Sequence, residues 1–95
     1  MPITVTVRIT GADMDRVREV ADEYPELGNE LRGLLEKHGL ISHRRFYNGS
    51  EILDIDEWDS EDGFRAFLEV GSPVIAKLAH LRGTDVPTDQ IWYPY

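Results

Sequence analysis

The segment YNGSEILDIDEW, residues 47–58, holds two aspartates, Asp54 and Asp56, within a run that otherwise has the composition of a β-strand. Asp is among the residues most depleted in strands, so the pair raises the question of what these carboxylates face. The preceding run, LISHRRFY, supplies His43 and Arg45. A carboxylate beside a histidine favours the imidazolium and orients the ring, which prepares a proton donor or acceptor near neutral pH.

A hairpin is predicted to bring these groups together, because Asn48-Gly49 separates the strand-like residues 40–47 from residues 50–57. Counting back from a two-residue turn places His43 opposite Asp54, with Arg45 as a diagonal neighbour. Side chains alternate along each strand, so two faces are expected. The face beneath the helices is predicted to hold Ile3, Val5, Val7, Ile9, Leu40, Phe46, Leu53 and Ile55. The opposite face is predicted to hold Thr4, Thr6, Arg8, Ile41, His43, Arg45, Tyr47, Ile52, Asp54 and Asp56.

Two interpretations of the second face stay open at this point. The charged residues fit a solvated lattice in which each pair contributes roughly 0.2 to 1 kcal/mol. However, Ile41, Ile52, Tyr47 and either Trp58 or Trp92 share that face, which is more apolar than a solvated surface requires. Such a mixed, aromatic face is typical of a pocket or an interface. Trp58 has a simpler alternative role, as an anchor for the helix that follows it.

The remaining elements follow from periodicity. Residues 3–9 alternate as a strand, and from Asp13 to Lys37 apolar residues recur at helical spacing, with Pro25 dividing the stripe into two pieces or kinking it. A second helix is predicted from Ser60, with a break at residues 71–73 and a further helix closed by Gly83. QIWYPY, residues 90–95, is predicted to be a short edge strand.

This order of elements predicts one α+β domain, residues 1–95, with the ferredoxin-like split βαβ arrangement. In that arrangement a four-stranded antiparallel sheet carries its helices on one face. The other face stays open. A chain of this size buries only somewhat more than about 60% of its unfolded surface and is therefore modestly stable. Dimerisation through the open face would bury more surface, and we expect it.

Composition excludes several classes of function. With 18 acidic and 10 basic residues the net charge is −8, which opposes binding to nucleic acid or anionic membranes. The chain has no cysteine, signal peptide or membrane-spanning run, so a cytoplasmic protein is expected. No metal site is predicted, because no calcium loop is present and His38, His43 and His80 lack paired ligand spacing. Phosphate-binding loops and nucleophile elbows are also missing.

Residues 52–83, ILDIDEWDSEDGFRAFLEVGSPVIAKLAHLRG, resemble the second half of antibiotic-biosynthesis-monooxygenase-like proteins, a group of dimeric α+β barrels. The features shared are the strand ending in Trp58, the acidic helix start, the Phe-x-x-Phe-Leu motif and the Ser-Pro pair. The resemblance implies a homodimer in which two open sheet faces enclose a barrel that binds a small molecule.

The resemblance also implies a cofactor-independent monooxygenase acting on a small aromatic or hydroxylated metabolite. His43 and Asp54 would move protons, and an anionic or enolate oxygen would be held by Arg8 and Arg45. The aromatic contacts of the substrate would come from Tyr47, Trp58 and Trp92. No bound cofactor is needed if the substrate's own carbanion passes an electron to dioxygen.

The sequence departs from the family pattern at several positions. Quinone-forming oxygenases tend to carry Asn and Tyr where this chain has Asp54 and Phe64. The positions that haem-degrading relatives use hold Val7 or Arg8, Phe67 and Lys77, which makes haem degradation a poor match. The alternative to an enzyme is a non-catalytic dimer of the same fold that binds a metabolite or has a structural role.

Overall fold

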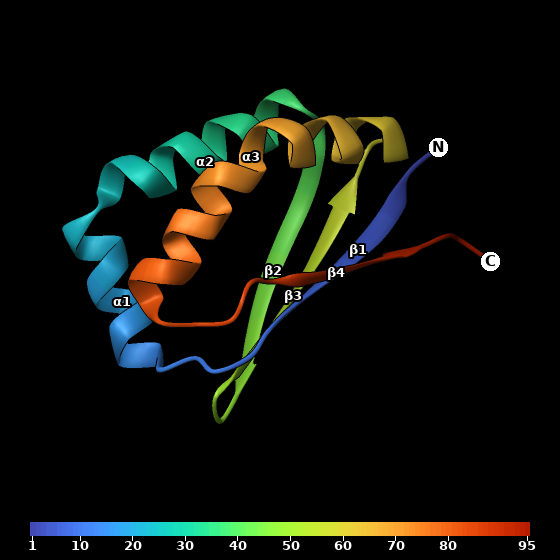
Figure 1. The fold of residues 1–95 in the computed structure, drawn as a ribbon. Helices are drawn as coiled ribbons and strands as arrows, with labels where there is room; N and C mark the ends of the chain where they lie inside the picture. Colours follow the sequence, from blue (N-terminus) through green and yellow to red (C-terminus); the bar gives the residue numbers. More distant parts are fainter.

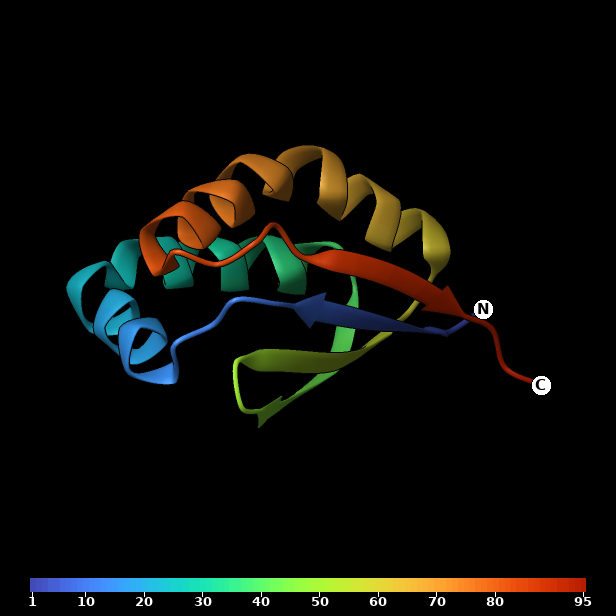
Figure 2. The same ribbon diagram turned by 60° about the horizontal axis from the view of Figure 1, so that its bottom comes forward.

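The sheet and its helices form two layers. The computed structural model describes all residues from Met1 to Tyr95. In chain order the elements are β1 (Ile3–Ile9), α1 (Met14–Glu23), α2 (Pro25–Lys37), β2 (Leu40–Asn48), β3 (Glu51–Trp58), α3 (Glu61–Arg82) and β4 (Thr88–Trp92). The strands are antiparallel in the order β2-β3-β1-β4, and all helices cover one face (Figure 1, Figure 2). This confirms the predicted ferredoxin-like α+β fold with an open sheet face.

The helix boundaries follow from capping chemistry. Asp13 caps α1 by accepting hydrogen bonds from the backbone N–H groups of Asp15 and Arg16 at 3.0 and 3.5 Å. Pro25 occupies the first position of α2, where its missing N–H group removes no helical hydrogen bond. The predicted division of the first helical stripe at Pro25 is therefore confirmed. None of the helices combines the length and the apolar character needed to cross a bilayer.

α3 runs unbroken for 22 residues, so the predicted break at residues 71–73 was wrong. Ser72 does not cap a new helix, because its hydroxyl donates to the carbonyl oxygen of Leu68 in the preceding turn. Gly71 serves packing, since a Cβ atom there would lie 2.9 Å from the ring of Phe67. The uninterrupted helix spans the sheet and carries Arg82 at its C-terminal end.

The hairpin between β2 and β3 turns one residue later than the sequence suggested. Its central residues are Gly49 and Ser50, and Gly49 has a positive φ of 60°, at the position that a type II′ turn gives to glycine. His43 therefore pairs with Asp56, and Arg45 with Asp54. The predicted pairing of His43 with Asp54 was wrong by two residues.

The two faces of β3 are also the reverse of those expected. Val5 pairs with Asp56 and Val7 with Asp54, which places both aspartates under the helices. They are only 8% and 5% exposed, whereas Leu53 is 40% exposed on the open face. Both faces of β3 carry apolar residues, so hydrophobic pattern alone did not decide which face is covered.

A β-bulge at Ile41 alters the alternation in β2. Leu40 pairs with Trp58 and Ser42 with Glu57, so Ile41 is the extra residue and is exposed. Leu40 and His43 consequently both lie on the helix-covered side of the sheet. A regular strand would place residues three apart on opposite faces.

Trp58 holds α3 against the end of the sheet. Its ring lies 5.4 Å from Phe64 and 5.2 Å from Phe67, measured between ring centroids, and the residue is 1% exposed. Ile3 and Val5 of β1 complete this cluster. The anchoring role considered for Trp58 is therefore confirmed.

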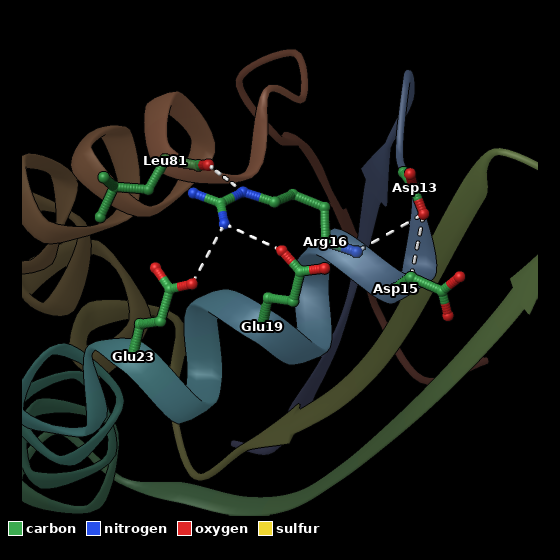
Figure 3. A network of polar contacts seen from close by, with 6 residues as sticks. All are labelled: Asp13, Asp15, Arg16, Glu19, Glu23 and Leu81. Carbon is green, nitrogen blue, oxygen red and sulfur yellow. Dashed lines mark hydrogen bonds and ion pairs between the residues drawn. The ribbon is translucent and has the colours of Figure 1, made fainter.

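Arg16 ties α1 to the C-terminal end of α3 (Figure 3). Its Nε donates to the backbone oxygen of Leu81 at 3.1 Å, and its Nη1 lies 3.1 Å from Glu19 and 3.6 Å from Glu23. The last carbonyl groups of a helix have no partner within it, so Arg16 satisfies one of them. This contact fixes the end of α3 that carries Arg82.

We expect Gly63→Ala to destabilise the protein by about 1 to 3 kcal/mol, as overpacking does. An added Cβ atom would lie 2.3 Å from the backbone oxygen of His38, so the turn before β2 and the start of α3 would have to separate. Urea unfolding measures the effect. Gly33→Ala is the matched control, because nothing lies within 4 Å of that position, and a gain of up to about 1 kcal/mol is expected there. Equal stability of the two variants would contradict the prediction.

Candidate functional site

A cavity of about 490 Å³ lies between the sheet and helices α2 and α3. Its walls are mainly apolar, and its polar side chains come from the sheet, from α2 and from the end of α3. Aromatic side chains in the wall include Trp58, Phe64 and Phe67. A concave apolar space with a few convergent polar groups is typical of a small-molecule site.

His43 and Asp56 form the first polar pair of this cavity. The His43 Nδ1–H group donates to Asp56 Oδ1 at 2.6 Å, and the Asp56 side chain is 11% exposed. This hydrogen bond raises the pKa of His43 above its ordinary value against the opposing effect of burial. The carboxylate therefore favours the imidazolium and fixes its orientation, while Nε2 is left for a ligand.

Arg45 and Asp54 form the second pair. Arg45 donates from Nε to Asp54 Oδ1 at 2.7 Å and from a terminal nitrogen to Oδ2 at 2.8 Å. The hydrogen bonds to Asp54 raise the pKa of Arg45. Both oxygens of Asp54 are thus engaged by one guanidinium in the bidentate geometry that binds carboxylates most strongly.

Arg82 is a cation of the cavity without a protein counter-ion, as is Arg32 of α2. The Nε of Arg82 is buried with no hydrogen-bond partner, and no ion pair includes its guanidinium. Burial lowers the pKa of Arg82, and the neighbouring charge of Arg45 adds to that effect. A desolvated donor with no partner is costly, so an anionic or carbonyl oxygen of a ligand would be favoured beside it.

Asp89 enters the cavity from the other edge of the sheet. It pairs with Val7 from β4 and is accessible to solvent. Partial burial against the cavity wall raises the pKa of the Asp89 carboxyl, and the negative charge of Asp56 raises it further. No hydrogen bond or ion pair holds its side chain.

The structure brings together four of the seven site residues that the sequence suggested. The cavity is lined by His43, Arg45, Asp54 and Trp58. The other three lie outside it. Arg8 pairs with Glu51 on the open face, and Tyr47 is 63% exposed near the hairpin.

Trp92 also lies on the open face. Its Nε1–H donates to Thr6 Oγ1 at 2.8 Å, and its side chain is exposed. The expected grouping of Arg8 and Trp92 with His43 was wrong for a physical reason. β1 and β3 pair so that Thr6 and Arg8 share a face with Ile55 and Leu53, away from the aspartates.

Three residues of the cavity were missed as site residues. Asp56 was not recognised as the partner of His43, although Gly49-Ser50 is itself a two-residue hairpin signal that gives the right register. Asp89 lies on the same face of the last strand as Ile91, and an aspartate is as unusual there as in β3. Arg82 gave no separate signal, because cations are common in the last turn of a helix.

The polar groups of the cavity suit proton transfer and anion binding. No three His, Asp or Glu side chains gather so as to hold a metal ion. One imidazolium and the two unpaired guanidinium groups, of Arg32 and Arg82, can stabilise negative charge on a ligand, and one unpaired carboxylate can accept a proton.

The fold is shared with solved structures of low sequence identity. SnoaB, a cofactor-independent oxygenase from Streptomyces nogalater, is 18% identical with a TM-score of 0.64, covering 99% of this chain and 93% of SnoaB. An antibiotic biosynthesis monooxygenase is 13% identical with a TM-score of 0.65, covering 98% of both chains. A dimeric ferredoxin-like protein from an uncultured marine organism is 14% identical with a TM-score of 0.67, covering 100% of this chain and 90% of the other.

The comparisons confirm the expected resemblance to antibiotic-biosynthesis-monooxygenase-like proteins at the level of the fold. No family model and no curated protein matches the sequence. At identities of 13 to 18% the likeness concerns the fold, and the chemistry has to be argued from the cavity itself.

Proposed function

We propose that the protein is a cofactor-independent monooxygenase that oxidises a small hydroxylated aromatic molecule inside the cavity of each chain. The observation that carries the proposal is the His43–Asp56 pair, which sets an oriented imidazolium at the side of a mainly apolar cavity. The shared fold of an oxygenase that needs no cofactor supports the same reaction class.

His43 is the proton donor of the proposed site. Its raised pKa keeps a larger share of the ring protonated at neutral pH, and its Nε2 is not occupied by Asp56. The imidazolium can stabilise an enolate oxygen and later protonate a peroxide. Arg82 adds positive charge to the cavity wall.

The role expected for Asp54 changes with this geometry. Because both of its oxygens accept hydrogen bonds from Arg45, Asp54 holds that guanidinium in place. We assign it a positioning role. Arg45 in turn contributes positive potential beside His43.

The oxidant in this proposal is dioxygen, and the reducing electrons come from the substrate. A hydroxylated aromatic that loses a proton becomes an electron-rich carbanion, which can pass one electron to dioxygen before the two radicals combine. The protein then needs to bind the rings, hold the developing charge and move protons. The lack of cysteine in the chain supports a cytoplasmic setting for this reaction.

The test is oxygen consumption with 1,8-dihydroxyanthrone, a tricyclic phenol with an acidic methylene group. The proposal expects saturable turnover to the quinone above the uncatalysed rate, with no added flavin, haem or metal. Binding without turnover, for this probe and for mono- and bicyclic phenols alike, would favour the non-catalytic metabolite-binding alternative. Native mass spectrometry of protein purified from its own cells would then identify the bound molecule.

We further propose that two copies form a homodimer through the open sheet face. That face exposes Phe46, Leu53 and Trp92, at 41%, 40% and 50% of their surface. A dimeric protein shares the fold. Exposed apolar patches of this kind mark protein interfaces.

We expect Leu53→Lys to produce monomers, because burying an unpaired ammonium group between two sheets is costly. Sedimentation velocity at micromolar concentration measures the change. Val70→Lys is the matched control, since Val70 is a comparably exposed apolar residue on α3. A wild-type monomer, or a Leu53→Lys dimer of unchanged affinity, would contradict this interface.

A further inference from the structure

The proposed reaction needs a group that accepts a proton, and the residues assigned so far do not provide one. His43 is favoured as the imidazolium, and the carboxylates of Asp54 and Asp56 are held by Arg45 and His43. The titratable and charged side chains that line the cavity are Arg32, His43, Arg45, Asp54, Asp56, Arg82 and Asp89. Asp89 is the one carboxylate among them without a hydrogen-bond or ion-pair partner.

Asp89 faces the same floor as the other polar groups. The strand pairings align Arg45, Asp54, Val7 and Asp89 in one row across all four strands. The next row contains His43, Asp56, Val5 and Ile91. With neighbouring strands about 4.8 Å apart, β2 and β4 are separated by about 14 Å. A substrate lying over Val7, which lines the cavity, would therefore have His43 on one side of its reacting carbon and Asp89 on the other.

The surroundings of Asp89 suit a base. Burial and the charge of Asp56 raise the pKa of its carboxyl, which makes the carboxylate a stronger proton acceptor than an ordinary aspartate. Its access to solvent allows protons to exchange with water. Arg45, Arg82 and His43 lie on other elements of the cavity, and none of them makes an ion pair with it.

We propose that Asp89 is the catalytic base, which takes the first proton from the substrate at the cavity edge opposite His43. This inference rests on the proposed function and names a residue that the sequence did not suggest. It divides the proton chemistry between the two edge strands of the sheet, with β4 carrying the first acceptor and β2 the first donor.

The proton count closes over one turnover. Asp89 removes a proton from the substrate CH₂ group, and the carbanion combines with dioxygen by electron transfer and radical coupling to give a peroxide anion. The imidazolium of His43 protonates that anion. Neutral His43 then takes the second C–H proton as the O–O bond breaks, and protonated Asp89 gives its proton to the leaving hydroxide. The sum is CH₂ plus O₂ giving C=O plus H₂O, with both residues restored.

The experiment compares the pH profile of kcat/KM for 1,8-dihydroxyanthrone in the wild type and in Asp89→Asn. The wild type is expected to show a bell, which rises as Asp89 ionises and falls as His43 loses its proton. Asp89→Asn should lower kcat/KM about 10²- to 10⁴-fold and remove the rising limb. Asp89→Glu should restore part of the rate.

The control is the double variant Asp89→Asn/Gln90→Glu. It has the net charge of the wild type, but its new carboxylate at position 90 lies on the open face of the sheet, outside the cavity. No rescue is expected. An Asp89→Asn variant with the rate and rising limb of the wild type would overturn the role of Asp89 and leave the proposed function standing. A wild type without turnover would overturn both. Circular dichroism confirms that the variants are folded.

Discussion

His43→Ala is expected to lower kcat/KM for 1,8-dihydroxyanthrone about 10²- to 10⁴-fold, because the variant loses the group that protonates the peroxide. The imidazole lies at the cavity edge, with Nδ1 fixed by Asp56 at 2.6 Å. Alanine leaves the cavity walls in place, so ligand binding should change less than turnover. Stopped-flow absorbance under a defined oxygen concentration measures both quantities.

Asp56→Asn tests the same group by moving its pKa. The carboxylate of Asp56 raises the pKa of His43, so its removal should shift the falling limb of the pH profile to lower pH. Ser42→Ala is the matched control. Ser42 is adjacent to His43 in the sequence, but its hydroxyl donates to Glu57 on the open face, so its removal should leave the falling limb unchanged. An unchanged falling limb in Asp56→Asn would contradict the assignment of that limb to His43.

The His43–Asp56 pair also makes stability depend on pH in a defined direction. A histidine whose pKa is raised by folding stabilises the native state fully below its unfolded value, about pH 6.5. That contribution is lost as the pH rises through the folded value. Urea midpoints should therefore fall between pH 5.5 and pH 8.5 more steeply for the wild type than for His43→Ala.

Arg45→Met is expected to lower the free energy of unfolding by about 1 to 3 kcal/mol, because the Arg45 side chain is 33% exposed and only its partner Asp54 is buried. The change leaves the carboxylate of Asp54, which is 5% exposed, without either of its two hydrogen-bond donors. Breaking a buried ion pair is costly because the remaining charge stays desolvated. Urea unfolding at neutral pH gives the value.

Arg44→Met is the matched control for Arg45→Met. Arg44 is the preceding residue of the same strand, and its guanidinium lies 5.0 Å from the ring of Phe46 on the exposed side of β2. Its replacement should cost no more than about 1 kcal/mol. The double variant Arg45→Met/Asp54→Leu should recover most of the lost stability, since an apolar pair can replace a buried ion pair. Equal losses in Arg44→Met and Arg45→Met would contradict a buried, coupled pair.

The order and type of the elements could be predicted because local signals agreed with the final packing. The alternation from Ile3 to Ile9, the cap at Ser60 and the stop at Gly83 all have their expected structures. α3 differed because Gly71 and Pro73 are usual stop signals, and tertiary packing of the helix against the sheet outweighed them. The Phe67 ring that lies against Gly71 is a contact that no local pattern reveals.

The candidate site could be predicted only in part because it depends on register. His43, Arg45 and Asp54 were recognised by their residue types, but their partners required the position of the turn and the bulge at Ile41. The covered face of β3 holds two buried aspartates, Asp54 and Asp56, which a hydrophobic pattern assigns to solvent. Their burial is possible because Arg45 and His43 lie opposite them and offset the cost of removing the carboxylates from water. This pairing can be recognised only when the register of the strands is known.

Both edges of the sheet discourage the addition of another strand. The ladder of β2 is interrupted at Ile41, and β4 is a five-residue strand between Pro87 and Pro94, which have no N–H group to donate. Bulges, short edge strands and prolines are devices by which natural sheets avoid joining edge to edge. The chain can therefore expose apolar side chains on its open face with less risk of forming fibres. Face-to-face association is complete with two copies, whereas edge-to-edge association could add further copies without limit.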